Sequence, residues 1–190
     1  MRDKIKDSIL ESIQVKEELL HGKVSTIIKI TEAIIACLRK GGKVILFGNG
    51  GSASDCQHIA AEFVGRFKKE RIALAAIALT TNTSIITALA NDYDYAVIFA
   101  RQIEALGQKN DLAIGISTSG KAKNVVAAIR QAKKQGIKTV ALTGGDGGEL
   151  VKAADIALIV PSLNTPRIQE AHITIGHIIC ELAEQNLVKN

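Results

Sequence analysis

The sequence predicts an α/β fold in which helices cover both faces of a central five-stranded parallel sheet. From residue 41 onward, short apolar runs rich in Val, Ile and Ala alternate with stretches of helical periodicity. Continuous apolar runs are typical of strands buried on both faces, and intervening helices are typical of parallel connections. The expected strands are Lys43–Phe47, Leu74–Thr80, Leu112–Ile116, Thr139–Thr143 and Ile156–Val160. We therefore expect a three-layer α/β/α sandwich preceded by N-terminal helices.

Residues 3 to about 40 predict two helices that come before the sheet. Apolar residues recur there at helical spacing, and the pattern breaks near His21 and Gly22. The first helix is amphipathic and lies outside the α/β repeat, which favours packing on a partner. We therefore assign residues 1–40 to a helical segment for oligomer packing and residues 41–190 to the α/β domain, and we expect a homo-oligomer.

Length and composition set the broad class of the protein. The 190 residues with 47% hydrophobic content are enough for one structural domain with a sizeable core. The longest apolar stretch, Ile72–Leu79, is far short of the roughly 20 residues that span a bilayer, and the charged amino end has no apolar segment. Three cysteines, an odd number, favour a reducing compartment. We expect a soluble, cytoplasmic protein without a membrane partner.

The positive charge of the chain does not have the pattern of a nucleic-acid binder. A net charge of +5 permits an acidic ligand, but the basic residues are scattered and only 3% of residues are aromatic. The densest basic cluster is Arg66, Lys68, Lys69 and Arg71, which falls in a loop after a predicted helix. We expect this cluster to be solvated.

A glycine-rich turn, Gly48-Asn49-Gly50-Gly51-Ser52, joins the first expected strand to a helix. Backbone N–H groups and the positive end of the helix dipole meet at such a turn, which suits a phosphate. A dinucleotide site would need a carboxylate about twenty residues on, which Ala76–Asn82 lacks, and a P-loop would need Lys after the last glycine. A tight turn without a ligand remains the alternative.

A second turn, Ser117-Thr118-Ser119-Gly120, follows another expected strand and precedes a helix over Asn124–Lys134. Its hydroxyl groups could cap that helix, or they could bind phosphate oxygens. Two such turns from one sheet favour the phosphate. The later turn from Gly144 to Gly148 suits positive φ angles and is assigned no chemistry.

Two helices carry groups that could do chemistry. His58 and Glu62 stand four residues apart and can bind a divalent metal or work as an acid/base couple, although a surface contact is the common meaning of such a pair. On the last helix, expected over Arg167–Leu187, Gln169 and His177 are about 12 Å apart along the axis. One metal barely reaches both, unless one residue lies off the regular helix or the two serve sites of different subunits. His172 points away from His177 and is expected to pack or cap.

The motifs together resemble the sugar isomerase (SIS) domain family, and within it the phosphoheptose isomerases. The resemblance runs over nearly the whole chain and covers both phosphate-type turns and the pair on the first core helix. Further matching motifs are Asn91-Asp92-Tyr93, Ala141-Leu142-Thr143-Gly144 with Asp146-Gly147-Gly148, and Arg167-Ile168-Gln169-Glu170 with His177. The resemblance implies a flavodoxin-like fold with a five-stranded parallel sheet.

The resemblance also implies a site and a reaction. One zinc ion per site would be held near His58, Glu62, Gln169 and His177, with Glu62 and His177 as the catalytic acid/base pair. The sugar phosphate would contact Asn49, Gly50, Gly51, Ser52, Glu62, Asn91, Asp92, Ser117, Thr118, Ser119 and Gln169. The family interconverts sedoheptulose 7-phosphate and D-glycero-D-manno-heptose 7-phosphate for ADP-heptose and lipopolysaccharide core synthesis. Its members are cytoplasmic homotetramers with sites at subunit interfaces.

Two departures and two alternatives accompany the resemblance. Many relatives carry Ser where this chain has Ala122, and some carry Asp where it has Pro166, so details of substrate contact differ. A branch of non-enzymatic regulators that bind DnaA keeps the turns but lacks the equivalents of Glu62 and His177. An isomerase or sensor of another sugar phosphate is the second alternative. The presence of both residues favours the enzyme.

Overall fold

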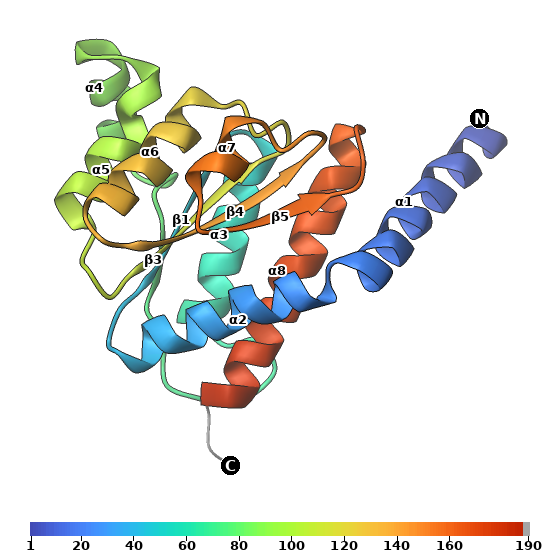
Figure 1. Cartoon of the computed structure of the whole chain (residues 1–190), viewed down its shortest axis with the longest axis horizontal. Coiled ribbons are helices and arrows are strands. Elements are labelled where there is room, and N and C mark those ends of the chain that lie inside the picture. The colour runs from blue at the N-terminus through green and yellow to red at the C-terminus, as the bar shows by residue number, and fades with distance from the viewer. Residues whose placement is uncertain (188–190) are drawn as a thin grey trace.

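The computed structural model of the chain describes residues 1–187 and has the expected three-layer architecture (Figure 1). Five parallel strands form one sheet in the order β2-β1-β3-β4-β5. The strands are β1 (Val44–Gly48), β2 (Ala76–Ala78), β3 (Leu112–Ser117), β4 (Lys138–Gly144) and β5 (Ile156–Val160). The predicted five-stranded parallel sheet is confirmed.

The expected strand β2 is shorter than the apolar run that predicted it. The run covers Leu74–Thr80, whereas only Ala76–Ala78 pairs with β1, from Val44 to Leu46. Leu74 and Leu79 lie outside the strand but pack against the two cores, so the apolar pattern is longer than the strand itself.

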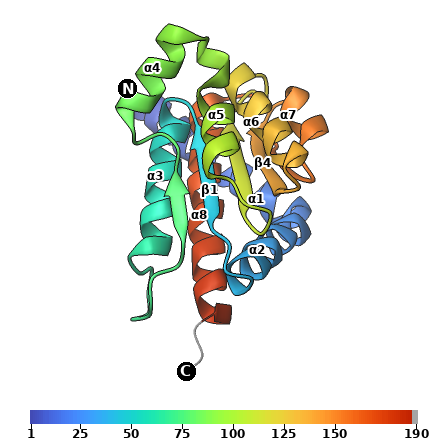
Figure 2. The same ribbon diagram turned by 90° about the vertical axis from the view of Figure 1, so that its left-hand side faces the viewer.

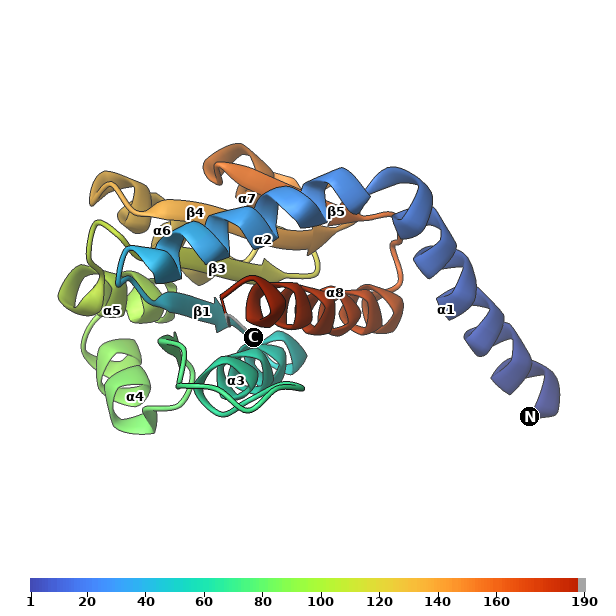
Figure 3. The same ribbon diagram turned by 90° about the horizontal axis from the view of Figure 1, so that it is seen from below.

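Helices cover both faces of the sheet (Figure 3). One face packs against α2 (Val24–Arg39), α3 (Gly51–Val64) and α8 (Thr165–Leu187). The other packs against α5 (Ile98–Leu106), α6 (Lys123–Lys134) and α7 (Gly148–Ala153). Side chains of the strands alternate between these two cores, so that Leu46 faces the first and Phe47 the second. Figure 2 shows α3 and α8 running in the same direction beside the sheet.

The remaining elements lie at the periphery. Helix α1 (Arg2–Gly22) ends where the sequence pattern breaks, and it projects from the body of the molecule (Figures 1 and 3). Helix α4 (Thr83–Asp92) and the short 3-10 helix η1 (Tyr95–Val97) precede α5. Within residues 1–187, no helix combines the length and the apolar character that crossing a membrane requires.

The strand order places the two phosphate-type turns next to each other. The chain leaves β1 toward β2 on one side, whereas β3, β4 and β5 continue on the other. Such a reversal leaves a crevice outside the carboxyl ends of the two strands, where open α/β sheets bind ligands. In the register, Gly48 at the end of β1 lies beside Ile116 of β3. The turns after Gly48 and after Ser117 therefore open at the same edge of the sheet.

The basic cluster after α3 is only partly solvated. The side chain of Arg66 is 61% exposed and that of Lys68 is 60% exposed, whereas that of Arg71 is only 2% exposed. The expectation of a solvated cluster is therefore wrong for Arg71. Its guanidinium is buried because it pairs with the carboxylate of Glu184 on α8.

His172 is a packing residue between α8 and β4, as expected. Its side chain is fully buried, and its Nε2 lies 3.2 Å from the carbonyl oxygen of Thr143, to which the N–H donates. Burial lowers the pKa of His172 to about 4, although the hydrogen bond to Thr143 acts in the opposite direction. The imidazole is therefore neutral in the folded protein at neutral pH.

We expect this histidine to weaken the fold as the solution is acidified. In the unfolded chain it takes up a proton below a pKa of about 6.5, whereas in the folded chain it does so only near pH 4. The free energy of unfolding should fall by about 1.5 kcal/mol between pH 6.5 and pH 5 on this account. Urea unfolding at several pH values measures the loss, and His172→Gln should lose less stability over this range. An identical pH dependence in both proteins would contradict the assignment.

Candidate active site

The first turn is shaped by glycines. Gly50 has a positive φ of 56° and precedes α3, whose N-terminus receives no side-chain cap hydrogen bond. A Cβ atom on Gly48 would lie 2.8 Å from the carbonyl oxygen of Ile116, so only glycine allows this close approach of β1 and β3. The turn thus presents the uncapped N-terminus of α3 at the carboxyl edge of the sheet, an arrangement suited to an anion.

The second turn leaves its hydroxyl groups free of any capping role for α6. The N-cap of α6 is Ala122, and no side chain makes a cap hydrogen bond there. The capping interpretation is therefore wrong. The hydroxyl of Ser119 accepts a hydrogen bond from the backbone N–H of Lys121, and Thr118 and Ser119 line a hollow of about 290 Å³. Lys121 reaches Asp146 across this hollow, with 3.1 Å between Nζ and Oδ2.

Residues at both ends of the glycine-rich turn after β4 hold the backbone of the second turn by hydrogen bonds. The N–H of Gly144 donates to the carbonyl of Thr118, and the N–H of Leu150 donates to the carbonyl of Gly120. Gly147 and Gly148 have positive φ angles, as the sequence predicts for this stretch. Although it was assigned no chemistry, this turn fixes the backbone of the hydroxyl-bearing turn.

Asn49 is held by two residues that sequence reasoning missed. The side-chain amides of Asn49 and Asn124 exchange two hydrogen bonds of 2.9 and 2.8 Å, and the hydroxyl of Tyr95 donates to Asn49 Oδ1. The backbone N–H of Val125 donates to Asn124 Oδ1, and this bond fixes which side of each of the two amides carries the NH₂ group. The sequence contained a signal for both residues, because Asn124 lies in the first turn of the helix after the second turn and Tyr95 follows the Asn91-Asp92 motif. With Lys123 they line a hollow of about 360 Å³.

Asn91 and Asp92 lie at the end of α4. Both are exposed, and the amide of Asn91 donates to the Asp92 carboxylate at 2.8 Å. The segment that follows them contains Tyr95, whose hydroxyl bonds Asn49 of the first turn.

Of the predicted substrate contacts, Ser52 is the most enclosed, with 3% of its surface exposed.

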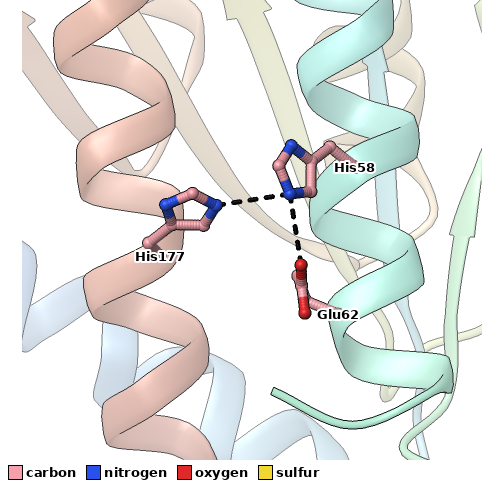
Figure 4. A group of neighbouring side chains, drawn as sticks. All are labelled: His58, Glu62 and His177. Atoms are coloured by element: carbon pink, nitrogen blue, oxygen red, sulfur yellow. Dashed lines mark hydrogen bonds and ion pairs between the residues drawn. The ribbon is translucent and has the colours of Figure 1, made fainter. Parts of the chain in front are cut away.

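His58, Glu62 and His177 form one cluster between α3 and α8 (Figure 4). His58 Nε2 lies 3.1 Å from Glu62 Oε1 and 3.3 Å from His177 Nε2. The imidazole of His177 also packs on the ring of Phe67, with 5.6 Å between centroids. The spacing of His58 and Glu62 in the sequence predicted their contact. The packing of α8 on α3 brings His177 to this pair.

The donor set of this cluster fits zinc. Two imidazole nitrogens and one carboxylate oxygen are the three protein ligands that many zinc sites use, with a fourth position left for water or substrate. All three donor atoms lie within 4.8 Å of one another. Tetrahedral bonds of about 2.05 Å place neighbouring ligand atoms about 3.3 Å apart, and the contacts of 3.1 and 3.3 Å in the cluster agree with this spacing.

Gln169, the fourth predicted ligand, lies elsewhere within the chain. Its side chain packs on Gly51, where an added Cβ would be 2.4 Å from Gln169 Nε2. Gly51 precedes His58 by seven residues, which is about 10 Å along α3. The structure thus brings Gln169 to the first phosphate-type turn, and it brings the other three predicted ligands to one another.

One half-buried carboxylate stands close to the cluster. Asp55 precedes His58 by one turn of α3, and its Oδ2 has no hydrogen-bond partner among the described residues. Burial raises the pKa of Asp55, while His58 opposes this shift. Sequence reasoning missed this residue, although its spacing of three from His58 puts both on neighbouring positions of one face.

Comparisons with known proteins agree with this geometry. The model of the SIS domain matches residues 9–144. A phosphoheptose isomerase from Thermodesulfovibrio yellowstonii is 54% identical over 98% of this chain and 93% of that protein. Solved structures of phosphoheptose isomerases from Neisseria gonorrhoeae and Francisella tularensis superpose with TM-scores of 0.92 and 0.93. Each is 40% identical, and the matches cover 97% and 96% of this chain and 98% and 97% of those chains.

Proposed function

Because this chain belongs to the SIS domain family and its 54% identical relative is a phosphoheptose isomerase, we infer that it converts D-sedoheptulose 7-phosphate into D-glycero-D-manno-heptose 7-phosphate. It is an aldose–ketose isomerase of heptose biosynthesis. The observation that carries this conclusion is the cluster of His58, Glu62 and His177, which places a carboxylate and an imidazole on facing helices.

We assign the proton transfers to Glu62 and His177. Isomerisation moves a proton between C1 and C2 through an enediol, so it needs a base and a partner acid. In the direction of the aldose, His177 takes the proton from C1 and Glu62 gives a proton to C2. A second proton passes from the C1 hydroxyl, beside His177, to the C2 oxygen, so the aldose has as many protons as the ketose. In the reverse direction Glu62 takes the proton from C2.

The phosphate of the substrate is assigned to the carboxyl edge of the sheet. The uncapped N-termini of α3 and α6 and the hydroxyls of Ser117, Thr118 and Ser119 support this assignment. Asn49, oriented by Asn124 and Tyr95, supplies a fixed amide beside the first turn. We place the sugar hydroxyls near Asn91, Asp92 and Gln169.

Zinc is the metal that we propose for the cluster, held by His58, Glu62 and His177. When bound, it would polarise the carbonyl group of the open-chain sugar and organise its oxygens. Gln169 joins this set only if it reaches the cluster of a neighbouring subunit, because its own chain holds it against Gly51.

We further propose a cytoplasmic homotetramer that feeds lipopolysaccharide core synthesis. Residues 1–40 would serve assembly, because α1 exposes Ile5, Ile9, Leu10, Ile13 and Leu20. With sites at the subunit interfaces, the turns and the acid/base pair that serve one substrate can come from different chains. Three buried cysteines without disulfide bonds fit a reducing compartment.

Turnover of sedoheptulose 7-phosphate by the purified protein tests the proposal. We expect activity to disappear after treatment with a chelator and to return when zinc is added back, whereas magnesium should not restore it because imidazole ligands favour zinc. Loss of activity that zinc does not reverse would contradict the metal assignment. A folded, zinc-loaded protein without any turnover would instead favour a regulator that binds DnaA or an enzyme for another sugar phosphate.

A further inference from the structure

The loop that follows α3, residues 65–75, has no helix or strand, yet one carboxylate holds its backbone. Glu184 Oε1 accepts a hydrogen bond from the N–H of Phe67 at 3.0 Å. Glu184 Oε2 accepts from Lys68 and Lys69 at 2.8 and 2.9 Å. Three consecutive N–H groups thus surround a carboxylate that is only 2% exposed.

Arg71 completes the arrangement from the other side. Its Nε donates to Glu184 Oε1 at 3.0 Å, and its Nη1 donates to the carbonyls of Phe63, Gly65 and Ile72. Its Nη2 donates to the carbonyl of Glu62 at 2.7 Å. The guanidinium therefore ties the last turn of α3 to the loop and to α8. We call Arg71 and Glu184 the clamp.

The clamp contacts both helices that carry the acid/base pair. Arg71 binds the backbone of Glu62 itself, and Glu184 follows His177 by seven residues, two turns along the same side of α8. The loop that the clamp holds carries Phe67, whose ring packs on the imidazole of His177. A displaced loop would therefore change the surroundings of His177, and a displaced last turn of α3 would move Glu62.

Stability alone is a weak reason for such a pair. Desolvation of two buried charges commonly offsets their attraction, so a buried ion pair contributes little net stability, whereas its many hydrogen bonds specify one geometry. We propose that Arg71 and Glu184 are positioning residues that set the relative placement of Glu62 and His177. The inference rests on the proposed catalytic roles of those two residues.

A conservative change at Glu184 tests the clamp. Glu184→Gln keeps the shape of the side chain but directs an NH₂ group at backbone N–H donors, so the loop should detach. We expect zinc affinity, measured by competition with a chromophoric chelator, to fall about 10- to 100-fold, as is typical when groups that orient metal ligands are lost. We also expect kcat to fall with little change in KM, because the phosphate-type turns lie outside the clamp.

Asp111→Asn is the matched control. Asp111 is also a buried carboxylate that holds backbone, because it accepts hydrogen bonds from the N–H groups of Lys43 and Gln108 and pairs with the Lys43 ammonium. It lies at the amino end of β3, far along the sheet from the turns. Both variants should lower the melting temperature, but only Glu184→Gln should change zinc affinity. Equal losses of zinc affinity in both would overturn the proposal.

The NMR signal of the His177 imidazole in metal-free protein gives a readout that does not depend on activity. The ring of Phe67 shifts this signal, so Glu184→Gln and Arg71→Lys should move it, whereas Asp111→Asn should not. Phe67→Leu leaves the clamp intact, and it replaces the clamp variants in this experiment if they do not fold. If Phe67→Leu left both the His177 signal and kcat unchanged, the proposal that the clamp acts on His177 through the Phe67 ring would be wrong. Failure of the wild type to turn over substrate would count against the proposed function instead, and the NMR comparison would still stand.

Discussion

Glu62→Gln should reduce kcat by about 10²- to 10⁴-fold, the range that a positioned general acid or base contributes. The amide keeps the size of the side chain and one oxygen beside His58, but it cannot take up a proton at neutral pH. His177→Gln should cause a loss of similar size, because we assign its imidazole to the other carbon of the same proton transfer. Steady-state kinetics with sedoheptulose 7-phosphate measures both.

The combined variant and a surface control sharpen this test. Residues that act as a unit are not additive, so Glu62→Gln with His177→Gln should be scarcely slower than either single variant. Glu70→Gln, which alters a carboxylate that is 91% exposed in the loop after α3, should keep normal turnover. Full activity of Glu62→Gln in a folded protein would contradict the assigned proton transfer.

Gly120→Ala should lower the free energy of unfolding by about 3 to 5 kcal/mol, from left-handed backbone strain and overpacking together. Gly120 has a φ of 65°, and a Cβ there would lie 2.0 Å from the carbonyl oxygen of Gly147. The carbonyl oxygen belongs to the backbone and the backbone fixes the position of a Cβ, so a side-chain rotation cannot relieve the clash. Chemical denaturation of the variant and the wild type measures the loss.

Gly136→Ala separates the two contributions. Gly136 has a φ of 73° but meets nothing within 4 Å of an added Cβ, so its variant should lose only about 1–2 kcal/mol from the left-handed conformation. The difference between the losses of unfolding free energy in the two variants measures the cost of disturbing the contact between the second turn and the turn after β4. Equal losses would mean that this contact relaxes without cost. A displaced second turn should also raise KM for the sugar phosphate in Gly120→Ala.

The positions of the strands could be predicted because a strand buried on both faces is apolar throughout. The run Ile156–Val160 and strand β5 coincide, whereas the run Leu74–Thr80 exceeds β2. Apolar runs mark burial, but they do not say which strand lies beside which. Only the family resemblance pointed to a flavodoxin-like arrangement, and the observed order β2-β1-β3-β4-β5 agrees with it.

The candidate site was predictable where its parts are local in sequence. His58 and Glu62 meet because residues four apart share a helix face. The approach of His177 depends on Gly176, where a Cβ would lie 2.7 Å from Ile59 Cδ1, so the missing side chain lets α8 pack closely on α3. A glycine inside a helix usually indicates low helix stability. The residues around Gly176 do not predict which distant helix it contacts.

The buried clamp shows the limit of reasoning from composition. Four basic residues in a loop indicate solvation, and this holds for Arg66 and Lys68. Arg71 differs because its acceptor, Glu184, stands 113 residues later in the chain. Sequence spacing predicts pairs within one helix, whereas a long-range pair requires the packing of α3 on α8 to be known.

The distance in sequence between the two halves of the acid/base cluster has a consequence for folding. His58 and His177 are 119 residues apart, and no local segment brings them together. Contacts of such long range form late, because the entropy of closing the intervening chain must be overcome first. Helical structure in α3 can therefore precede the assembled site. On the catalytic roles proposed for Glu62 and His177, recovery of turnover during refolding should mark the docking of α8.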